Sequence, residues 1–158
     1  MPSFLLHLIR DLHEGTTAQV RTEHGLSTAF STTSGVRQGC VLAPSLFSCA
    51  IDWIMDQCSA NLGTSIGQQR FTDIDYADDG ALLTDDPKKW PDLLQDYEAA
   101  ASTVGMHVNW KKTKLQNVGA GEPPPPVTIG SETVAAVDKF TYLGSDVSSS
   151  GSSSPEIL

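Results

Sequence analysis

The chain has 158 residues, of which 39% are hydrophobic and 18% charged, a composition that indicates one globular domain and excludes a disordered or fibrous protein. Ten basic and nineteen acidic residues give a net charge of −9, whereas a free-standing nucleic-acid-binding domain is usually basic. No apolar run approaches the roughly 20 residues that span a bilayer, which excludes a membrane-spanning protein.

The N-terminal part of the chain is expected to form a helix, a hairpin and a loop. The apolar run over 3–12 predicts a helix that Gly15 ends. The stretches 17–22 and 28–33 are rich in Thr, Val and Phe and flank a Glu-His-Gly turn, which predicts a β-hairpin. The glycines of the segment 34–39 indicate a loop before the next helix.

Two helices and a tight hairpin are expected in the middle of the chain. Pro44 suits the first turn of a helix that runs to about Ser59, and its apolar stripe comprises Phe47, Ala50, Ile51, Ile54 and Cys58. Residues 63–67 are expected to be a loop. The segment 70–83 predicts two strands around an Ala-Asp-Asp turn. A second helix over 87–104 has an apolar face of Leu93, Leu94, Tyr97, Ala100, Ala101 and Val104.

The C-terminal part is expected to consist of short strands and polar connections. Residues 106–110 predict a strand, and the four prolines of 123–126 predict a stiff surface spacer. A hairpin over 127–137 and a strand over 140–143 follow, before a polar segment rich in serine. Strands and two long helices that alternate loosely predict an α+β layer architecture.

The acidic hairpin turn is the first candidate site. Nine acids lie between positions 73 and 98, and Asp78 and Asp79 are adjacent in the sequence Tyr-Ala-Asp-Asp. Two carboxylates held on a tight turn repel each other unless a cation neutralises them, and Mg²⁺ prefers carboxylate oxygen. The alternative is a plain turn, because Asp is a common turn residue that bonds to its own backbone.

Two further segments carry candidate binding residues. In the loop 34–39, glycines allow a ligand to approach the backbone, Arg37 offers a fork for phosphate, and Gln38 can hydrogen-bond a base or sugar. The cluster Lys-Lys-Thr-Lys at 111–114 can supply phosphate contacts or a proton donor. The alternatives are a bare connecting loop and a solvated basic face, respectively.

Taken in order, these motifs resemble the reverse transcriptase of non-LTR (LINE-like) retrotransposons. The matching segments are SGVRQGCVLAPSLF (34–47), FTDIDYADDGALL (71–83), GMHVNWKKTK (105–114) and FTYLGS (140–145). The resemblance covers nearly the whole chain. It implies a right-hand polymerase palm, RNA-directed DNA synthesis from dNTPs on an RNA template and a DNA primer, and Mg²⁺ or Mn²⁺ as cofactor. It implies no membrane and no protein partner.

The resemblance also implies roles for individual residues. Asp78 and Asp79 match the metal-binding and catalytic pair, and Lys112 matches a lysine proposed to help pyrophosphate leave. Four residues match the segment that binds nucleotide and template: Gly35, Arg37, Gln38 and Gly39. Three match the primer grip: Tyr142, Leu143 and Gly144.

Two departures from the family's pattern matter. Gly80 stands where the family usually has an apolar β-former, which is expected to soften the hairpin. The family has a further metal-binding aspartate in an earlier strand, but residues 1–33 contain only Asp11, which lies in the expected helix. We therefore expect an incomplete palm domain over 1–147, a Ser-rich tail over 148–158 leading to a thumb outside this sequence, and little or no polymerisation by this chain alone.

Other interpretations stay open at this point. The chain could be a non-catalytic nucleic-acid-binding remnant or a maturase-like RNA-binding palm, or simply an α+β domain with an acidic metal-binding hairpin. The cysteines at 40, 49 and 58 fit neither a disulfide framework nor a zinc site and favour a reducing compartment. The resemblance implies the nucleus or the cytoplasm.

Overall fold

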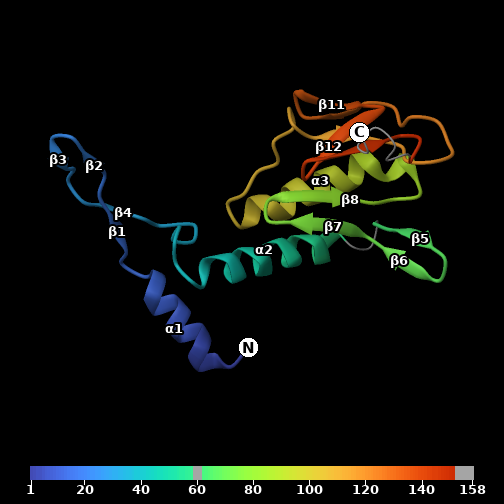
Figure 1. Ribbon diagram of the computed structural model, residues 1–158. Coiled ribbons are helices and arrows are strands. Elements are labelled where there is room, and N and C mark those ends of the chain that lie inside the picture. Colours follow the sequence, from blue (N-terminus) through green and yellow to red (C-terminus); the bar gives the residue numbers. More distant parts are fainter. Residues whose placement is uncertain (59–61, 152–158) are drawn as a thin grey trace. The chain divides into compact units, whose positions relative to one another are not determined.

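The computed structural model describes residues 1–58 and 62–151. The chain divides into two compact units, Met1–Phe47 and Ser48–Leu158 (Figure 1). Within the described ranges, no helix combines the length and apolar character that a membrane span requires.

The first unit begins with helix α1, Ser3–His13, as the apolar run predicts. The N–H of Glu14 donates to the carbonyl of Arg10 and closes the last turn, and Gly15 follows with φ +63°. No residue of α1 is buried, and its apolar side chains are exposed apart from Ile9, which is half-buried. The helix is therefore held by its own backbone hydrogen bonds rather than by packing.

The expected hairpin of the first unit is present but interrupted. Its four short strands are β1 (Thr17–Ala18), which pairs with β4 (Phe30–Ser31), and β2 (Arg21–Thr22), which pairs with β3 (Gly25–Leu26). Between the two ladders, the Ser27 hydroxyl accepts from the N–H of Val20 at 2.9 Å, and the Gln19 amide donates to the Ser27 carbonyl at 3.0 Å. Together with a backbone bond from the N–H of Ser27 to the Val20 carbonyl at 2.9 Å, these side-chain bonds connect the two ladders across an irregular segment, so the strands are shorter than predicted.

Helices α2 (Ala43–Cys58) and α3 (Trp90–Thr103) form where the apolar stripes predict them. The buried face of α2 consists of Ala43, Ile51, Ile54, Met55 and Cys58. A 3-10 turn, η1 (Pro87–Lys89), precedes α3, and the Asp86 carboxylate caps it by accepting from the N–H of Lys88 at 3.0 Å. Gly105 ends the helix with φ +76°. Val104 is 44% exposed and does not belong to the buried face, contrary to expectation.

Two antiparallel hairpins follow α2 in sequence. They are β5 (Thr64–Ile66) with β6 (Gln69–Phe71), and β7 (Asp73–Tyr76) with β8 (Asp79–Leu82). The expected loop over 63–67 is wrong, because Gly67 (φ +65°) forms the turn and the residues before it are free to pair. The expected hairpin over 70–83 is narrower, because residues 70 and 71 pair with β5 instead.

The C-terminal strands form two small sheets. A three-stranded sheet has the order β10 (Val127–Ile129), β11 (Glu132–Ala136), β9 (Lys114–Leu115), and a separate hairpin pairs β12 (Lys139–Tyr142) with β13 (Ser145–Ser148). Leu115, Val127 and Val134 pack with Leu94 of α3 into one core cluster. The strand expected at 106–110 is wrong, and β13 was not anticipated. The proline segment 123–126 has no regular structure, but Pro124 is buried, so the segment does not lie wholly on the surface as predicted.

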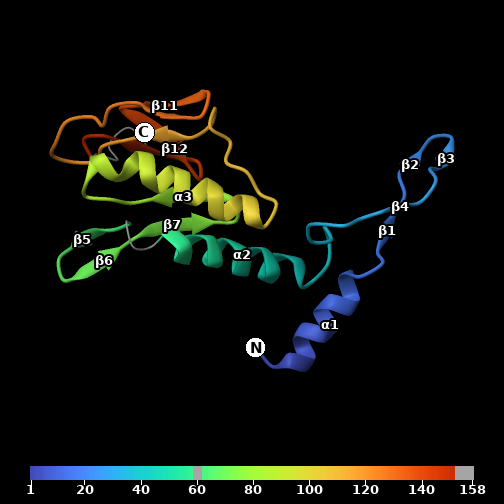
Figure 2. The same ribbon diagram turned by 180° about the vertical axis from the view of Figure 1, so that it is seen from behind.

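Helices and small, mostly antiparallel sheets make the fold α+β. In both views the β7–β8 hairpin lies between α2 and α3 (Figures 1 and 2). The side chains agree with this arrangement, because Leu82 of β8 packs on the cluster of Cys58, Leu62 and Leu93. The two helices thus support the hairpin that carries the acidic turn.

Candidate active site

The acidic turn forms the exposed tip of the β7–β8 hairpin. Tyr76 pairs with Asp79, so Ala77 and Asp78 make up the connecting loop. Ala77 has φ +55°, which suits the first position of a two-residue hairpin loop. Asp78 and Asp79 are both exposed. The predicted hairpin with Asp78 at its tip is confirmed, and two adjacent carboxylates project into solvent there.

A second pair of carboxylates lies on one face of β7. Asp73 and Asp75 are two positions apart in the strand, which places their side chains on the same face. The pKa of Asp75 is raised to about 6, first of all by partial burial. The charge of Asp73, a hydrogen bond shared with Asp73 and the charge of Asp52 raise it further. Our residue assignments missed this pair, although the Asp-Ile-Asp alternation was a visible signal for it.

Gly80 provides the space in which the Asp75 carboxyl lies. The two residues face each other across the ladder, and a Cβ on Gly80 would come within 3.0 Å of the Asp75 carboxyl and 3.4 Å of the Met55 side chain. The Tyr97 hydroxyl is 4.0 Å from the same point. A larger residue at position 80 would therefore displace the carboxyl or the helix side chain. Packing against the Asp75 carboxyl and the Met55 side chain therefore explains why a glycine is suited to position 80 of this hairpin.

Tyr142 connects the candidate primer-grip segment to the acidic hairpin. Its hydroxyl lies 2.8 Å from the carbonyl of Ile74 and 3.2 Å from the carbonyl of Asp79, and donates to both. Burial and the charges of Asp75 and Asp79 raise the pKa of Tyr142. Tyr142 is the last residue of β12, and the turn after it has left-handed backbone at Leu143 (φ +50°) and Gly144 (φ +85°).

Lys112 lies in a turn rather than after a strand. Its N–H donates to the Asn109 carbonyl at 3.0 Å, and its side chain is exposed.

Glu98 of α3 anchors the preceding segment, because one carboxylate oxygen accepts from the N–H of Val108 at 2.8 Å and the other lies 2.9 Å from the His107 ring. This anchor explains the absence of the expected strand. Partial burial raises the pKa of Glu98, but hydrogen bonds from His107 and Val108 outweigh it and lower that pKa overall.

The structure brings some predicted residues together and leaves others apart. Tyr142 contacts the backbone of the hairpin that carries Asp78 and Asp79. No hydrogen bond or ion pair within the described part of the chain connects Lys112 with those aspartates. The loop with Gly35, Arg37, Gln38 and Gly39 belongs to the first unit, where all four residues are exposed.

The donor set of the hairpin tip suits a hard divalent cation. Asp78 and Asp79 offer carboxylate oxygens only, which Mg²⁺ and Mn²⁺ accept. Within residues 1–58 and 62–151, no three His, Cys, Asp or Glu side chains are grouped so that they could hold a metal ion. The tip therefore contributes two carboxylates, and the chemistry of these donors fits the predicted metal.

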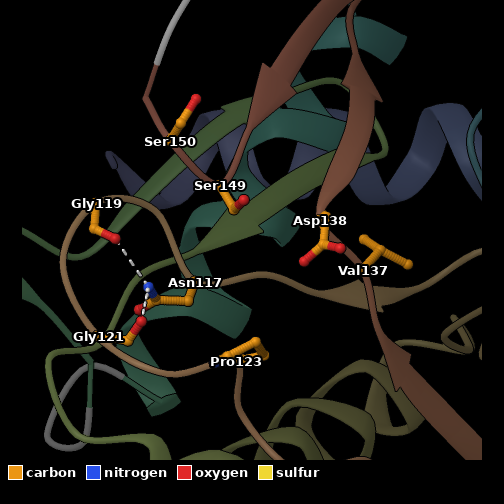
Figure 3. Close-up of a pocket in the computed structure, with 8 residues that line it drawn as sticks. All are labelled: Asn117, Gly119, Gly121, Pro123, Val137, Asp138, Ser149 and Ser150. Atoms are coloured by element: carbon orange, nitrogen blue, oxygen red, sulfur yellow. Dashed lines mark hydrogen bonds between the residues drawn. The ribbon is translucent and has the colours of Figure 1, made fainter.

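A pocket of about 280 Å³ lies elsewhere in the second unit, and its lining residues are shown in Figure 3. The Asn117 amide donates to the carbonyls of Gly119 and Gly121 and closes one wall, and Asp138 and Ser149 lie opposite. None of the predicted site residues lines this pocket. The hairpin tip, which is an open surface, remains the candidate active site.

Comparisons with known proteins match these motifs to one family. Residues 3–147 match the reverse transcriptase (RNA-dependent DNA polymerase) family. The chain is 29% identical over 121 residues to a Retrovirus-related Pol polyprotein from type-1 retrotransposable element R2 of Nasonia vitripennis, a match that covers 70% of this chain and 12% of the relative. It is 30% identical over 147 residues to an RNA-directed DNA polymerase from mobile element jockey of Drosophila funebris, with 89% and 16% covered.

A second R2 polyprotein, from Popillia japonica, is 28% identical over 134 residues, which cover 78% of this chain and 19% of that protein. The chain therefore spans less than a fifth of the length of these curated relatives. The family match extends over nearly all of the sequence and includes the hairpin with the adjacent aspartates. The chain belongs to the reverse transcriptase (RNA-dependent DNA polymerase) family, and its relatives place it with the non-LTR retrotransposons.

Proposed function

We propose that this chain is the palm core of an RNA-directed DNA polymerase that extends a DNA primer on an RNA template. The observation that carries the proposal is the antiparallel hairpin that exposes the consecutive residues Asp78 and Asp79 at its tip, within the segment that matches the family. In the reaction, the primer 3′-hydroxyl attacks the α-phosphate of a dNTP, the bond between the α- and β-phosphates breaks, and pyrophosphate leaves.

Asp78 and Asp79 would hold the divalent cation, Mg²⁺ or Mn²⁺. When bound there, the cation supplies neutralisation of the charge on the transferred phosphoryl group. The hairpin's contribution is position: the turn is short, and β8 is anchored through Leu82 on the core of α2 and α3. A rigid support of this kind keeps the two carboxylates in one place during the reaction.

The remaining predicted residues would act on the substrates. Arg37 and Gln38, with the backbone around Gly35 and Gly39, would contact the template and the incoming nucleotide. Lys112 would stabilise or protonate the leaving pyrophosphate, for which its exposed ammonium is suited. The turn formed by Leu143 and Gly144 would contact the primer.

Metal binding tests the core of the proposal. Mn²⁺ added to the ¹⁵N-labelled chain is expected to broaden the NMR signals of residues 73–82 before others. Asp78→Asn should weaken this broadening, whereas Asp85→Asn, which removes the same charge from another exposed acid, should leave it intact. If Asp78→Asn leaves the broadening unchanged, the assignment of the metal site is wrong.

Primer extension tests the activity. The 158-residue chain alone is expected to incorporate dNTPs no faster than a protein-free control, because the one aspartate of residues 1–33, Asp11, lies in α1 and does not match the family's further metal-binding aspartate. A longer polypeptide that restores the family's further aspartate should synthesise DNA. In it, Asp78→Ala should abolish synthesis and Lys112→Ala should slow it without loss of template binding. Asp78-dependent synthesis by the 158 residues would show that they contain a complete clamp, and RNA binding without metal binding would favour the RNA-binding interpretation.

A further inference from the structure

The Tyr142 hydroxyl bridges both strands of the acidic hairpin from a distant part of the sequence. Its two acceptors are the carbonyls of Ile74 in β7 and Asp79 in β8, at 2.8 and 3.2 Å, and they lie 68 and 63 positions away along the chain. One hydroxyl proton is thus shared between two backbone carbonyls. Both acceptors are backbone carbonyls, so the contact depends on where the hairpin backbone lies and not on the rotamer of a hairpin side chain.

These two bonds are also the link between the two hairpins. Among the hydrogen bonds of the described residues, no others join residues 139–148 to residues 73–82. The opposite end of the β12–β13 hairpin is held elsewhere, because the Gln116 amide donates to the Val147 carbonyl at 2.9 Å. Near its tip, the hairpin is therefore tied to the acidic turn through one side chain.

Tyr142 lies directly before the turn of its own hairpin, so its hydrogen bonds also affect the position of that turn. Tyr142 pairs with Ser145 and immediately precedes the turn formed by Leu143 and Gly144. With φ +50° and +85°, both turn residues have left-handed backbone, which suits a tight two-residue turn. A displacement of the tyrosine ring would therefore displace the turn next to it.

We propose that Tyr142 is a positioning residue, whose hydroxyl holds the Leu143-Gly144 turn in a fixed place relative to Asp78 and Asp79. This inference rests on the proposed function in one respect: the turn is taken to contact the primer whose end must lie at the metal. Polymerisation requires reacting atoms to be held in register, and a shift of about 1 Å in such an arrangement can cost about a hundredfold in rate.

The test compares Tyr142→Phe with Tyr76→Phe in the 158-residue chain. Both substitutions remove one hydroxyl, and Tyr76 lies on the same acidic hairpin but is 68% exposed. In Tyr142→Phe, amide hydrogen exchange is expected to be about fivefold faster at both 73–82 and 143–145, the effect of losing one hydrogen bond. In Tyr76→Phe, exchange at 143–145 should stay within experimental error. An unchanged exchange rate at 73–82 in Tyr142→Phe would overturn the proposal.

Mn²⁺ supplies the readout that a merely structural role would not change. In the wild-type chain, Mn²⁺ is expected to broaden the amide signals of 143–145 together with those of the acidic hairpin. In Tyr142→Phe the hairpin should broaden as before, whereas broadening at 143–145 should fall by about half or more. Equal broadening in both proteins would overturn the proposal. Failure of Mn²⁺ to affect the wild-type hairpin would instead contradict the proposed metal site, and the exchange comparison would still decide the role of Tyr142.

Discussion

The two units differ in how their apolar residues are covered. In the first unit, Thr16 and Ala43 are the buried residues, while large apolar side chains stay exposed, including Phe4, Leu6, Leu8, Leu26, Phe30 and Val41. In the second unit, the side chains of Ile54, Leu62, Leu93, Leu115 and Val134 are almost completely buried. Local hydrogen bonds are enough to define a helix and a hairpin in the first unit, but a core that resists opening exists only in the second.

Backbone strain follows the same division. Ala77 and Leu143 are the non-glycine residues with positive φ among those described, and both lie in the second unit, at the tips of the acidic hairpin and of the β12–β13 hairpin. In the first unit, such positions are occupied by glycines. A strained residue persists only where the surrounding structure determines its conformation. The unit with a core can therefore hold strained turns, and these are the turns that we propose to act on metal and primer.

The largest expected effect is a loss of core packing. Leu93 is 0% exposed, and Leu93→Ala is expected to lower the free energy of unfolding of the second unit by about 3 kcal/mol, because it removes buried methyl groups and leaves a cavity. Leu8→Ala in the first unit, at a residue 58% exposed, should change it by less than about 0.5 kcal/mol. Urea denaturation followed by tryptophan fluorescence measures both. Equal effects would contradict the division into a unit with a core and a unit without one.

A smaller effect is expected from the acid pair Asp73 and Asp75 on β7, of which Asp73 is half-buried. The pKa of Asp75 in the folded chain is about 6, above the ordinary value near 4. Its stabilising contribution is therefore fully present below about pH 4 and is lost as the pH rises through about 6. Asp75→Asn should remove this loss, so the variant is expected to melt at a higher temperature than wild type at pH 8 and at a similar temperature at pH 4.

The control for this prediction is Asp92→Asn, which makes the same change in net charge at an exposed position of α3. It should not alter the difference in melting temperature between pH 4 and pH 8. A wild-type chain whose melting temperature is the same at both values would show that Asp75 is not held against Asp73 and Asp52 as the structure has it. Thermal unfolding monitored by circular dichroism gives the comparison.

The sequence predicted those elements for which local signals and packing agree. The helices α2 and α3 and the turn between β7 and β8 lie where they were expected, because most residues of the predicted stripes also face the core. The exceptions are Phe47 and Ala50, which are half-buried, and Val104, which is exposed. One wrong segment, the loop expected at 63–67, becomes a hairpin through a local turn at Gly67, and another is decided by a distant contact. The expected strand at 106–110 is held as a loop by Glu98, and an acceptor nine and ten positions upstream of the residues that it binds leaves no periodic signal.

The candidate site was predictable to a similar extent. The aspartates at the turn follow from the motif, but the Asp75–Gly80 contact and the bonds from Tyr142 depend on register and tertiary structure. Gly80 illustrates the difference. From the sequence it weakens a strand, whereas in the structure it leaves room for a carboxyl that faces it across the ladder.

The smallest expected effect concerns the strained turn of the β12–β13 hairpin. Leu143 is 51% exposed and has φ +50°, a conformation that costs a branched residue about 1 kcal/mol, and it precedes Gly144. Asparagine adopts this conformation more readily, and Asn-Gly is the preferred pair for such a turn. Leu143→Asn is therefore expected to raise the free energy of unfolding by about 1 kcal/mol, while Leu143→Ala, which keeps the strain and removes only exposed surface, should change it by less than about 0.5 kcal/mol.

If the turn is strained because the primer needs an apolar residue there, the more stable Leu143→Asn should bind a primer–template duplex more weakly in a filter-binding assay. A variant that gains stability without any loss of primer binding would show that the strain at Leu143 has no part in that contact.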